Sequence, residues 1–178
     1  MIISGRNPSK IRIKKQVNFF AIWTTIYGKF EIDKKLNMNG IYQWIFKIKG
    51  NGKYISHVCI GIKSIHSMNY MSNQHGISDE YLFPKGCARV YGINCNGGIY
   101  GDSGLNCNVV SWMDYGFDDG DKITMQVNMK NDVVCFIKNE MINSSKTVSF
   151  DASKTYHMAV CIDQVHIEVD LLEFQVYP

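Results

Sequence analysis

The chain consists of short strand-like segments separated by turns. Residues 42–48, 58–62 and 156–162 are rich in β-branched and aromatic residues, and residues 29–34 alternate polar with apolar side chains. No stretch keeps the 3.6-residue period of a helix for more than about two turns. Many short strands joined by turns predict an all-β protein, a two-sheet antiparallel β-sandwich of the jelly-roll type.

Glycine and asparagine mark the expected turns, because both tolerate positive φ. Gly50-Asn51-Gly52 predicts a hairpin in which residues 53–62 pair with residues 42–48. Further turns are predicted at residues 96–98, 118–121 and 131–132. Residues 64–86 show no clear alternation and predict a long surface connection, and connections of that length are uncommon unless they have a function.

The composition indicates one globular domain. With 178 residues, 46% of them hydrophobic, the chain is long enough to bury a substantial core. We expect a single domain over residues 10–178, preceded by a loosely ordered segment over residues 1–9. The apolar runs are shorter than the roughly 20 residues of a membrane helix, and the first residues lack the apolar core of a signal peptide. A cytoplasmic location without a membrane partner is therefore expected.

The six cysteines agree with a reducing compartment. None forms a Cys-x-x-Cys pair, and no Cys/His spacing fits a zinc site. Cys59, Cys135 and Cys161 lie within apolar strand-like runs, where a thiol behaves as a small hydrophobic group. We expect reduced structural thiols rather than disulfides.

The net charge of +3 is too small to indicate a nucleic-acid partner. Basic and apolar residues alternate in Lys10-Ile11-Arg12-Ile13-Lys14, so the bases would share one face of a strand. This pattern is typical of an edge strand protected by charge. A stripe that contacts phosphates is the other interpretation, but no aromatic residues interleave with the bases as they do in single-strand binders.

Three further groups of residues are of types found in binding or catalytic sites, but none fits the spacing of a known motif. Asp118, Asp119 and Asp121 lack the spacing of a calcium-binding loop and predict a structural turn. Residues 91–104 are rich in glycine but contain no phosphate-binding motif and lead into a strand-like segment. None of the five histidines has a serine or cysteine partner in a nucleophile motif. We expect no metal, no cofactor and no catalytic residue.

The segment Glu168-Val169-Asp170-Leu171-Leu172-Glu173 is the sharpest catalytic alternative. It resembles the E-x-D-x-x-E signature of family 16 glycoside hydrolases, in which the first Glu is the nucleophile and the last is the acid/base. Retaining hydrolysis needs two carboxyls roughly 5 Å apart, and one bulged strand can present both on the same face. The competing interpretation is a half-exposed terminal strand. Exposed aromatic residues beside Glu168 and Glu173 would favour a lectin-like carbohydrate-binding protein.

The order of the segments resembles the SPRY (B30.2) family. The matching pieces are residues 42–48, 58–62, 91–92, 96–100, 117–127, 133–139 and 156–162, so that the resemblance runs from about residue 42 to residue 174. The sequence departs from the family at Asn128, where members usually have Asp, and at Glu140, where they usually have Gly. Both positions concern turn geometry. The resemblance implies a concanavalin A-like sandwich of two antiparallel sheets.

The resemblance also implies a function. Family members recognise proteins through loops at one end of the sandwich, often within ubiquitin ligases, and carry neither catalytic residues nor a cofactor. By analogy, the loop after residues 58–62 contributes His66 and Tyr70, and the loop between the last two strands contributes Asp163 and Gln164. We therefore expect a monomeric, non-catalytic module that binds a peptide or protein, as the substrate-recognition part of a ubiquitin ligase or as an adaptor.

Overall fold

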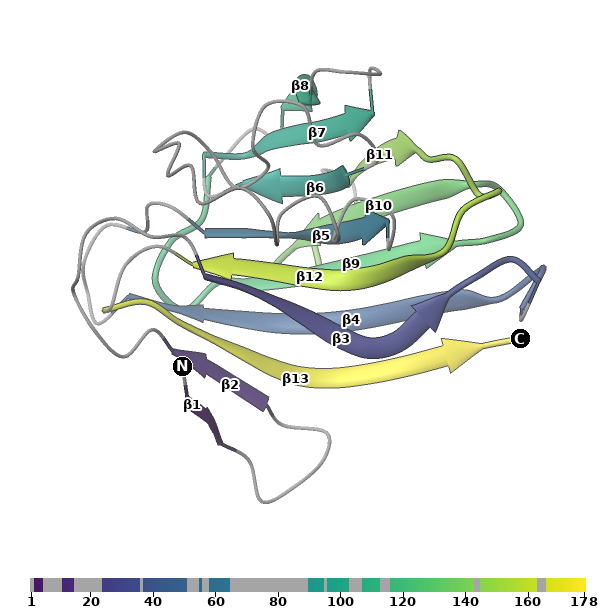
Figure 1. Cartoon of the computed structure of the whole chain (residues 1–178). Coiled ribbons are helices and arrows are strands. Elements are labelled where there is room, and N and C mark those ends of the chain that lie inside the picture. The colour runs from purple at the N-terminus through teal and green to yellow at the C-terminus, as the bar shows by residue number, and fades with distance from the viewer. Residues whose placement is uncertain are drawn as a thin grey trace, which may run out of the picture.

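The computed structural model describes residues 2–4, 11–14, 24–35, 37–50, 55, 58–64, 90–94, 96–102, 107–112, 116–142, 145–162 and 166–178. Within these residues, thirteen β-strands form two antiparallel sheets that pack face to face (Figure 1). The expected all-β sandwich is confirmed. No helix in this part of the chain is long and apolar enough to cross a membrane.

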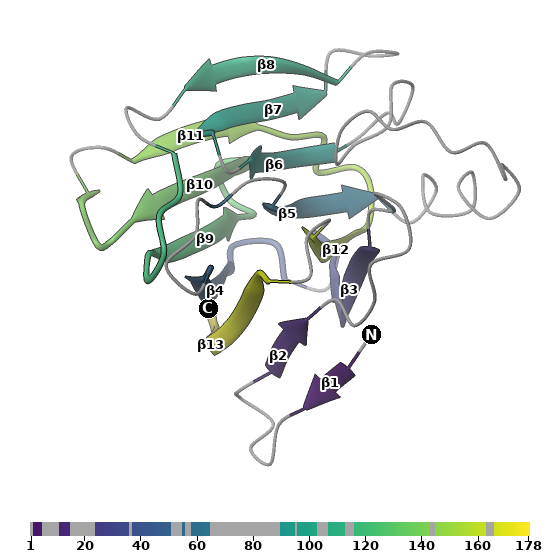
Figure 2. The ribbon, with the colours of Figure 1, turned by 90° about the vertical axis from the view of Figure 1, so that its left-hand side faces the viewer.

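The two sheets differ in size. The larger sheet has the order β1 (Ile2–Ser4), β2 (Ile11–Lys14), β13 (Glu168–Tyr177), β4 (Ile41–Lys49), β9 (Lys122–Asn128), β10 (Val133–Lys138) and β11 (Lys146–Ser149). The smaller sheet has the order β3 (Thr24–Ile32), β12 (Tyr156–Ile162), β5 (Val58–Ser64), β6 (Val90–Asn94), β7 (Gly98–Asp102) and β8 (Cys107–Trp112). The sheets converge where β11 contacts β7 and β8 (Figure 2).

The hydrophobic core fills the space between the sheets. Buried and half-buried residues alternate along β4, as expected for a strand with one face in a core. Trp44 on its buried face is 2% exposed and stacks on Phe174 of β13, with ring centroids 5.1 Å apart. From the smaller sheet, Ile60 and Tyr156 join the same cluster. Trp44 thus belongs to this core.

Two strands of the smaller sheet are buried on both faces. All seven residues of β5 are buried, and so are six of the seven residues of β12. Ile60 of β5 and Val160 of β12 belong to the core cluster. Alternation therefore puts Cys59 and Cys161 on the outer face of the sheet, where both are at most 2% exposed.

The hairpin predicted at Gly50-Asn51-Gly52 is wrong. β4 pairs with β13 and β9 in the larger sheet, whereas β5 pairs with β12 and β6 in the smaller sheet. The chain therefore crosses between the sheets after β4, and turn propensity alone does not distinguish a crossing from a hairpin. The hairpin predicted at residues 96–98 is confirmed, because β6 pairs with β7 and Gly97 has a φ of 85°.

The edge position predicted for the basic strand is also wrong. β2 pairs with β13 on one side and with β1 on the other, so β1 shields its second edge. Glu168 of β13 lies opposite Lys14, and Asp170 lies opposite Arg12. The domain boundary at residue 10 stays a prediction.

A β-bulge interrupts β13 and places the polar residues of this strand on one face. The pairing with β4 shifts register between Leu171 and Glu173, so that Leu172 is the extra residue. Before the bulge Val169 and Leu171 are buried, and after it Phe174 packs on the core. The outer face therefore carries Glu168, Asp170, Glu173 and Gln175. If residues 171–173 alternated regularly, without a bulge, Glu173 would lie on the same face as Leu171.

Lys138 is a charged residue on the buried face of β10. It is 6% exposed and follows Val134 and Phe136 on that face. Its Nζ lies 2.7 Å from Asp121 Oδ2 and donates a hydrogen bond of 2.6 Å to the carbonyl oxygen of Gly116. A buried charge is costly unless it is both paired and hydrogen-bonded, and Lys138 meets both conditions.

The carboxylate of Asp121 extends this ion pair into the neighbouring turns. Asp121 Oδ2 accepts a hydrogen bond of 2.6 Å from the amide of Asp118, and Oδ1 accepts one of 2.7 Å from Asn139 Nδ2. The amide of Ile48 donates to the carbonyl oxygen of Asp121 at 2.8 Å, and the amide of Gly120 donates to that of Ile48 at 2.9 Å. The acidic run is therefore a structural turn, as predicted, and it joins the ends of β4, β9 and β10.

The turn after β10 contains a residue in an unfavourable backbone conformation. The amide of Met141 donates to the carbonyl oxygen of Lys138 at 3.0 Å, and between them Asn139 has a φ of 49° and Glu140 a φ of 63°. Two positive φ values are typical of a type I′ turn, for which Asn-Gly is the preferred sequence. Glu140 thus occupies a position where glycine would be unstrained.

Replacing Lys138 with methionine is expected to lower the free energy of unfolding by about 3 kcal/mol, because the carboxylate of Asp121 stays buried without its partner. Urea unfolding followed by tryptophan fluorescence measures the loss. Lys122→Met is the control, since Lys122 Nζ lies 3.6 Å from Glu140 Oε1 in an exposed pair, and its effect should stay below about 0.5 kcal/mol. Equal losses in the two variants would contradict the role given to the buried pair.

Glu140→Gly is expected to raise the free energy of unfolding by about 0.5 to 1 kcal/mol, because glycine removes the strain of a positive φ. Thermal unfolding of the variant beside the wild type measures the gain. Glu31→Gly is the matched control, since Glu31 is exposed within β3, where glycine weakens a strand. A Glu140→Gly variant that melts below the wild type would overturn this explanation.

Candidate functional site

Strand register distinguishes the two ends of the sandwich. In the antiparallel pair of β5 and β12, Ser64 lies opposite Tyr156 and Val58 lies opposite Ile162. We call the end where β5 finishes the Ser64 end, and the end where β12 finishes the Ile162 end. In Figure 1 the arrows of β5 and β12 point in opposite directions.

The four predicted binding residues, His66, Tyr70, Asp163 and Gln164, lie outside the described residues. The strand ends next to them are described. The chain leaves β5 and re-enters β6 at the Ser64 end, because Lys63 lies opposite Val90. Residues 163 and 164 follow the last residue of β12, at the Ile162 end. The two segments thus leave the sandwich at opposite ends, and a role for these residues in binding stays a prediction.

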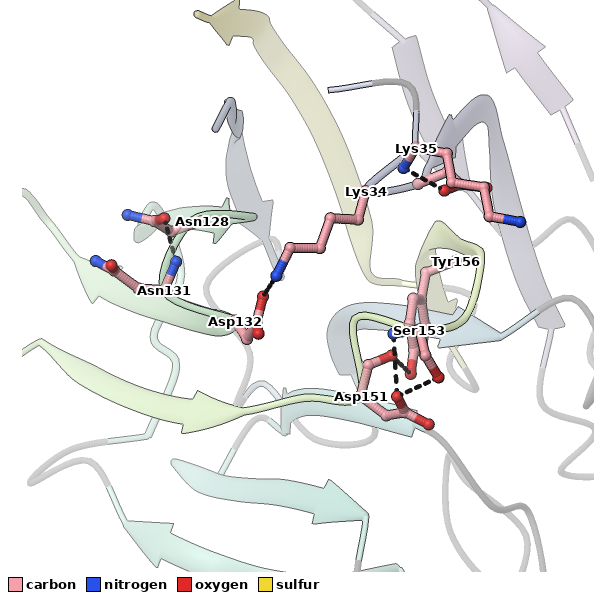
Figure 3. A network of polar contacts seen from close by, with 9 residues as sticks. Lys34, Lys35, Asn128, Asn131, Asp132, Asp151, Ser153 and Tyr156 are labelled. Carbon is pink, nitrogen blue, oxygen red and sulfur yellow. Dashed lines mark hydrogen bonds and ion pairs between the residues drawn. The ribbon is translucent and has the colours of Figure 1, made fainter. Parts of the chain in front are cut away.

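Three turns lie together at the Ser64 end. They comprise residues 33–40 after β3, residues 128–132 between β9 and β10, and residues 150–155 between β11 and β12. Lys34 Nζ lies 2.7 Å from Asp132 Oδ1, and this ion pair joins the smaller sheet to the larger one (Figure 3). The carbonyl oxygen of Asp132 accepts a hydrogen bond of 3.0 Å from the amide of Phe150. We call these three segments the Ser64-end turns.

Each of these turns is also held by hydrogen bonds of its own. The amide of Asn131 donates to Asn128 Oδ1 at 3.0 Å, so the amide side chain of Asn128 supplies the acceptor that an aspartate would. The amide and the hydroxyl of Ser153 donate to Asp151 Oδ1 at 3.0 and 2.6 Å, and Tyr156 Oη donates to the carbonyl oxygen of Asp151 at 2.9 Å (Figure 3). Side-chain oxygens that bind the backbone two or three residues on stabilise tight turns.

Asp33 connects two of the Ser64-end turns. Its Oδ1 accepts a hydrogen bond of 2.7 Å from the amide of Lys35, and its Oδ2 accepts one of 2.9 Å from Thr155 Oγ1. The hydrogen bond from Lys35, with that from Thr155, holds the pKa of Asp33 below its ordinary value. Both bonds favour the charged carboxylate.

An exposed methionine projects from the first of these turns. Met38 is 63% exposed. Beyond it, a Cβ added to Gly40 would lie 1.8 Å from Asn37 Nδ2, so a larger residue there would displace the side chain of Asn37. The amide of Met129 donates to the carbonyl oxygen of Gly40 at 3.0 Å, which fixes this turn against the end of β9. The Ser64-end turns thus present an apolar side chain on a hydrogen-bonded support.

Sequence reasoning missed Met38 and the ion pair between Lys34 and Asp132. The turn at residues 131–132 was predicted from its Asn-Asp dipeptide and is confirmed. Lys34, the ion-pair partner of Asp132, could not be predicted from a local pattern, because 98 residues separate Lys34 from Asp132. No local pattern marks a contact between two turns of different sheets.

The outer face of the larger sheet is a second candidate surface. Glu168 and Glu173 share this face because of the bulge at Leu172, as the E-x-D-x-x-E interpretation requires. Asp170, between them, pairs with Lys49, whose Nζ lies 2.6 Å from Asp170 Oδ2. Of the three carboxylates in the motif, that of Asp170 therefore forms an ion pair, and those of Glu168 and Glu173 lie on the same side of β13.

A row of polar side chains continues across this face. Gln175 Nε2 donates to Glu173, Tyr177 Oη donates to Gln175, and Gln43 Nε2 lies 3.5 Å from Tyr177 Oη. Gln126 Nε2 on β9 then donates to Gln43 Oε1 at 2.6 Å. Tyr177 is 40% exposed. This outer-face row runs from β13 over β4 to β9 and contains an exposed aromatic ring.

Neither surface resembles a metal site. Within the ranges that the structure describes, no three His, Cys, Asp or Glu side chains are grouped so that they could hold a metal ion.

Comparison with known proteins shows the fold. No protein-family model matches the sequence, and no curated protein matches it. Among solved structures, the SPRY domain of human HERC1 is 15% identical with a TM-score of 0.57, and the match covers 85% of this chain and 82% of that one. A human SPRY domain is 13% identical with a TM-score of 0.58, over 93% of this chain and 92% of that one.

Lectins share the same architecture. The lectin UEA-II, solved in complex with galactose, is 10% identical with a TM-score of 0.54, and the match covers 94% of this chain and 86% of that one. The chain thus has the concanavalin A-like β-sandwich fold of SPRY domains and lectins, as the order of its segments predicted.

The hydrogen bonds to Asp33 predict a pH dependence. Because its pKa is lower in the folded state, Asp33 stabilises the fold above its unfolded pKa of about 3.9, and this contribution is lost as the pH falls through the lower folded pKa. The melting temperature of Asp33→Asn should therefore lie below that of the wild type at pH 6, and the difference should shrink below about pH 4. Glu31→Gln controls for the loss of one exposed negative charge. A difference that grows on acidification would contradict this assignment.

Proposed function

We propose that this chain is a non-catalytic protein-interaction domain that binds a peptide or protein segment through loops at the Ser64 end. The observation that carries the proposal is the joining of turns from both sheets by the Lys34–Asp132 ion pair and the Asp33–Thr155 hydrogen bond. A surface that is ordered before binding loses less conformational entropy when its partner arrives. Loops on a rigid scaffold are the usual site of recognition.

His66 and Tyr70 are the proposed principal contacts. The segment that carries them begins and ends at the Ser64 end, since Lys63 lies opposite Val90. A tyrosine supplies a large contact area with few rotatable bonds. Met38 adds an exposed apolar side chain at the same end. Asp163 and Gln164 are proposed as a second contact, which has to be tested separately because their segment follows the opposite end of β12.

The similarity in fold to SPRY domains supports a protein partner in general. We further propose that the domain acts as a monomer, as the substrate-recognition part of a ubiquitin ligase or as an adaptor. A cytoplasmic location is part of this proposal.

Carbohydrate binding is a second candidate function, with the outer-face row as its site. Carboxylates and amides hydrogen-bond well to hydroxyl groups, and the row combines them with the exposed ring of Tyr177. The lectin UEA-II, whose fold is similar, was solved with galactose. In the catalytic form of this alternative, Glu168 would be the nucleophile and Glu173 the acid/base of a retaining glycoside hydrolase.

The test compares variants of equal melting temperature in a pull-down, followed by titration of the purified partner. His66→Ala/Tyr70→Ala is expected to weaken binding at least tenfold, as loss of a central anchor does. Met38→Ala should weaken it several-fold. Ile142→Ala is the matched control, because Ile142 is 73% exposed in the turn after β10, at the Ile162 end, and it should leave binding unchanged.

Other outcomes point elsewhere. Binding lost only in Asp163→Ala/Gln164→Ala would move the site to the Ile162 end. Binding of a glycan array that Glu173→Gln and Tyr177→Phe abolish, without any protein partner, would replace the proposal with the carbohydrate alternative. Release of sugar from a glycan substrate, lost in Glu168→Gln, would show an enzyme.

A further inference from the structure

Cys59 and Cys161 are direct partners in the smaller sheet. In the antiparallel pairing of β5 with β12, Cys161 lies opposite Cys59. Both residues alternate with core residues of their strands and lie on the outer face of the sheet, where they are 0% and 2% exposed. The structure holds both as thiols. Two cysteines thus face the same side at facing positions of adjacent strands.

This arrangement places the two Cα atoms within the range of a disulfide. Directly opposed residues in antiparallel strands have Cα atoms about 4.5 or 5.5 Å apart, depending on whether the pair is hydrogen-bonded. Disulfides join cysteines whose Cα atoms are roughly 4.4 to 6.8 Å apart. The Cα separation of either kind of pair therefore falls within this range, and the two Cβ atoms point to the same face. No change of strand register is needed to join the two sulfur atoms.

We propose that Cys59 and Cys161 form an oxidation site, in which a low-molecular-weight disulfide such as oxidised glutathione converts the two thiols into an intrachain cross-strand disulfide. The thiolate of one cysteine attacks the glutathione disulfide, which forms a mixed disulfide and releases one glutathione. The thiolate of the other cysteine then attacks the protein sulfur of the mixed disulfide and releases the second glutathione. The two thiol protons leave with the two glutathione molecules, and the cysteines lose two electrons.

Burial determines the rate and the selectivity of this reaction. Because both sulfur atoms are shielded, the first attack requires β5 and β12 to open locally, so that oxidation is slow under native conditions. Cys135 lies on β10 in the other sheet and is half-buried. Its reaction with glutathione would give a mixed disulfide and not the cross-strand bond. The two products differ in mass and in the peptides they join.

The bond would brace the strands that lead to both candidate loop segments. It closes a loop from residue 59 to residue 161, which contains residues 65–89, and residues 163–165 follow two positions after Cys161. A loop of this length restricts the unfolded chain strongly. We expect oxidation to raise the melting temperature by roughly 5 to 15 °C and dithiothreitol to reverse the rise.

The test equilibrates the wild-type protein in glutathione redox buffers, alkylates the remaining thiols and maps the peptides by mass spectrometry. The expected product links the peptide with Cys59 to the peptide with Cys161 and is lighter than the reduced pair by two hydrogen atoms. A variant with Cys87, Cys95, Cys107 and Cys135 replaced by serine should give the same product. Adding Cys161→Ala to that variant should abolish both the link and the rise in melting temperature.

Two results would overturn the proposal. In one, Cys59 and Cys161 stay fully alkylatable after equilibration in the most oxidising buffer and after a cycle of unfolding and refolding in it. In the other, Cys59 is found linked to a cysteine other than Cys161. Because the wild-type protein carries the primary measurement, the outcome does not depend on whether the serine variant folds.

Discussion

The buried ion pair between Lys138 and Asp121 organises the centre of the larger sheet. A lysine on the core face of β10 is tolerated because its ammonium group finds a carboxylate and a backbone carbonyl. The same carboxylate fixes the turn before β9, whose backbone is hydrogen-bonded to the end of β4. Three neighbouring strands thereby share one anchoring point. The stacking of Trp44 on Phe174 and the continuation of the core toward β13 depend on β4 being held in that register.

The two ends of the sandwich use similar residues for different purposes. At the Ile162 end, Asp121 and Lys138 are buried and hold strands of one sheet together. At the Ser64 end, Lys34 and Asp132 are partly exposed and link one sheet to the other. The polar groups of the first end are enclosed, whereas those of the second stabilise a surface. Since the fold alone accommodates protein binders and sugar binders, this contrast is what supports our proposal of a binding surface at the Ser64 end.

Local patterns in the sequence predicted local structure well and long-range structure poorly. Strand-like composition found β4, β5 and β12, the order of the segments included β9 and β10, and the Asn-Asp and Asp-Asp-Gly-Asp turns lie where they were expected. The glycine-rich stretch after β4 was read as a hairpin because a crossing between sheets uses the same residues. The alternating residues 29–34 overlap the longer strand β3, and β11 was missed because its four residues carry little apolar signal. The predicted loop residues came from a family resemblance, and nothing local pointed to Met38 or to the Lys34–Asp132 pair.

The bulge in β13 inserts one residue into the last strand and shifts its alternation of core-facing and outward-facing residues by one position. Before Leu172 the odd-numbered residues face the core, and after it the even-numbered residues do. Phe174 therefore reaches Trp44, while Glu173 and Gln175 lie on the outer face. A chain shortened by this one residue would alternate regularly, with Leu171 and Phe174 still toward the core and Glu173 and Gln175 still on the outer face. The fold therefore tolerates the loss of the extra residue, whereas the loss of two residues at this point would turn the phenylalanine outward and separate it from Trp44.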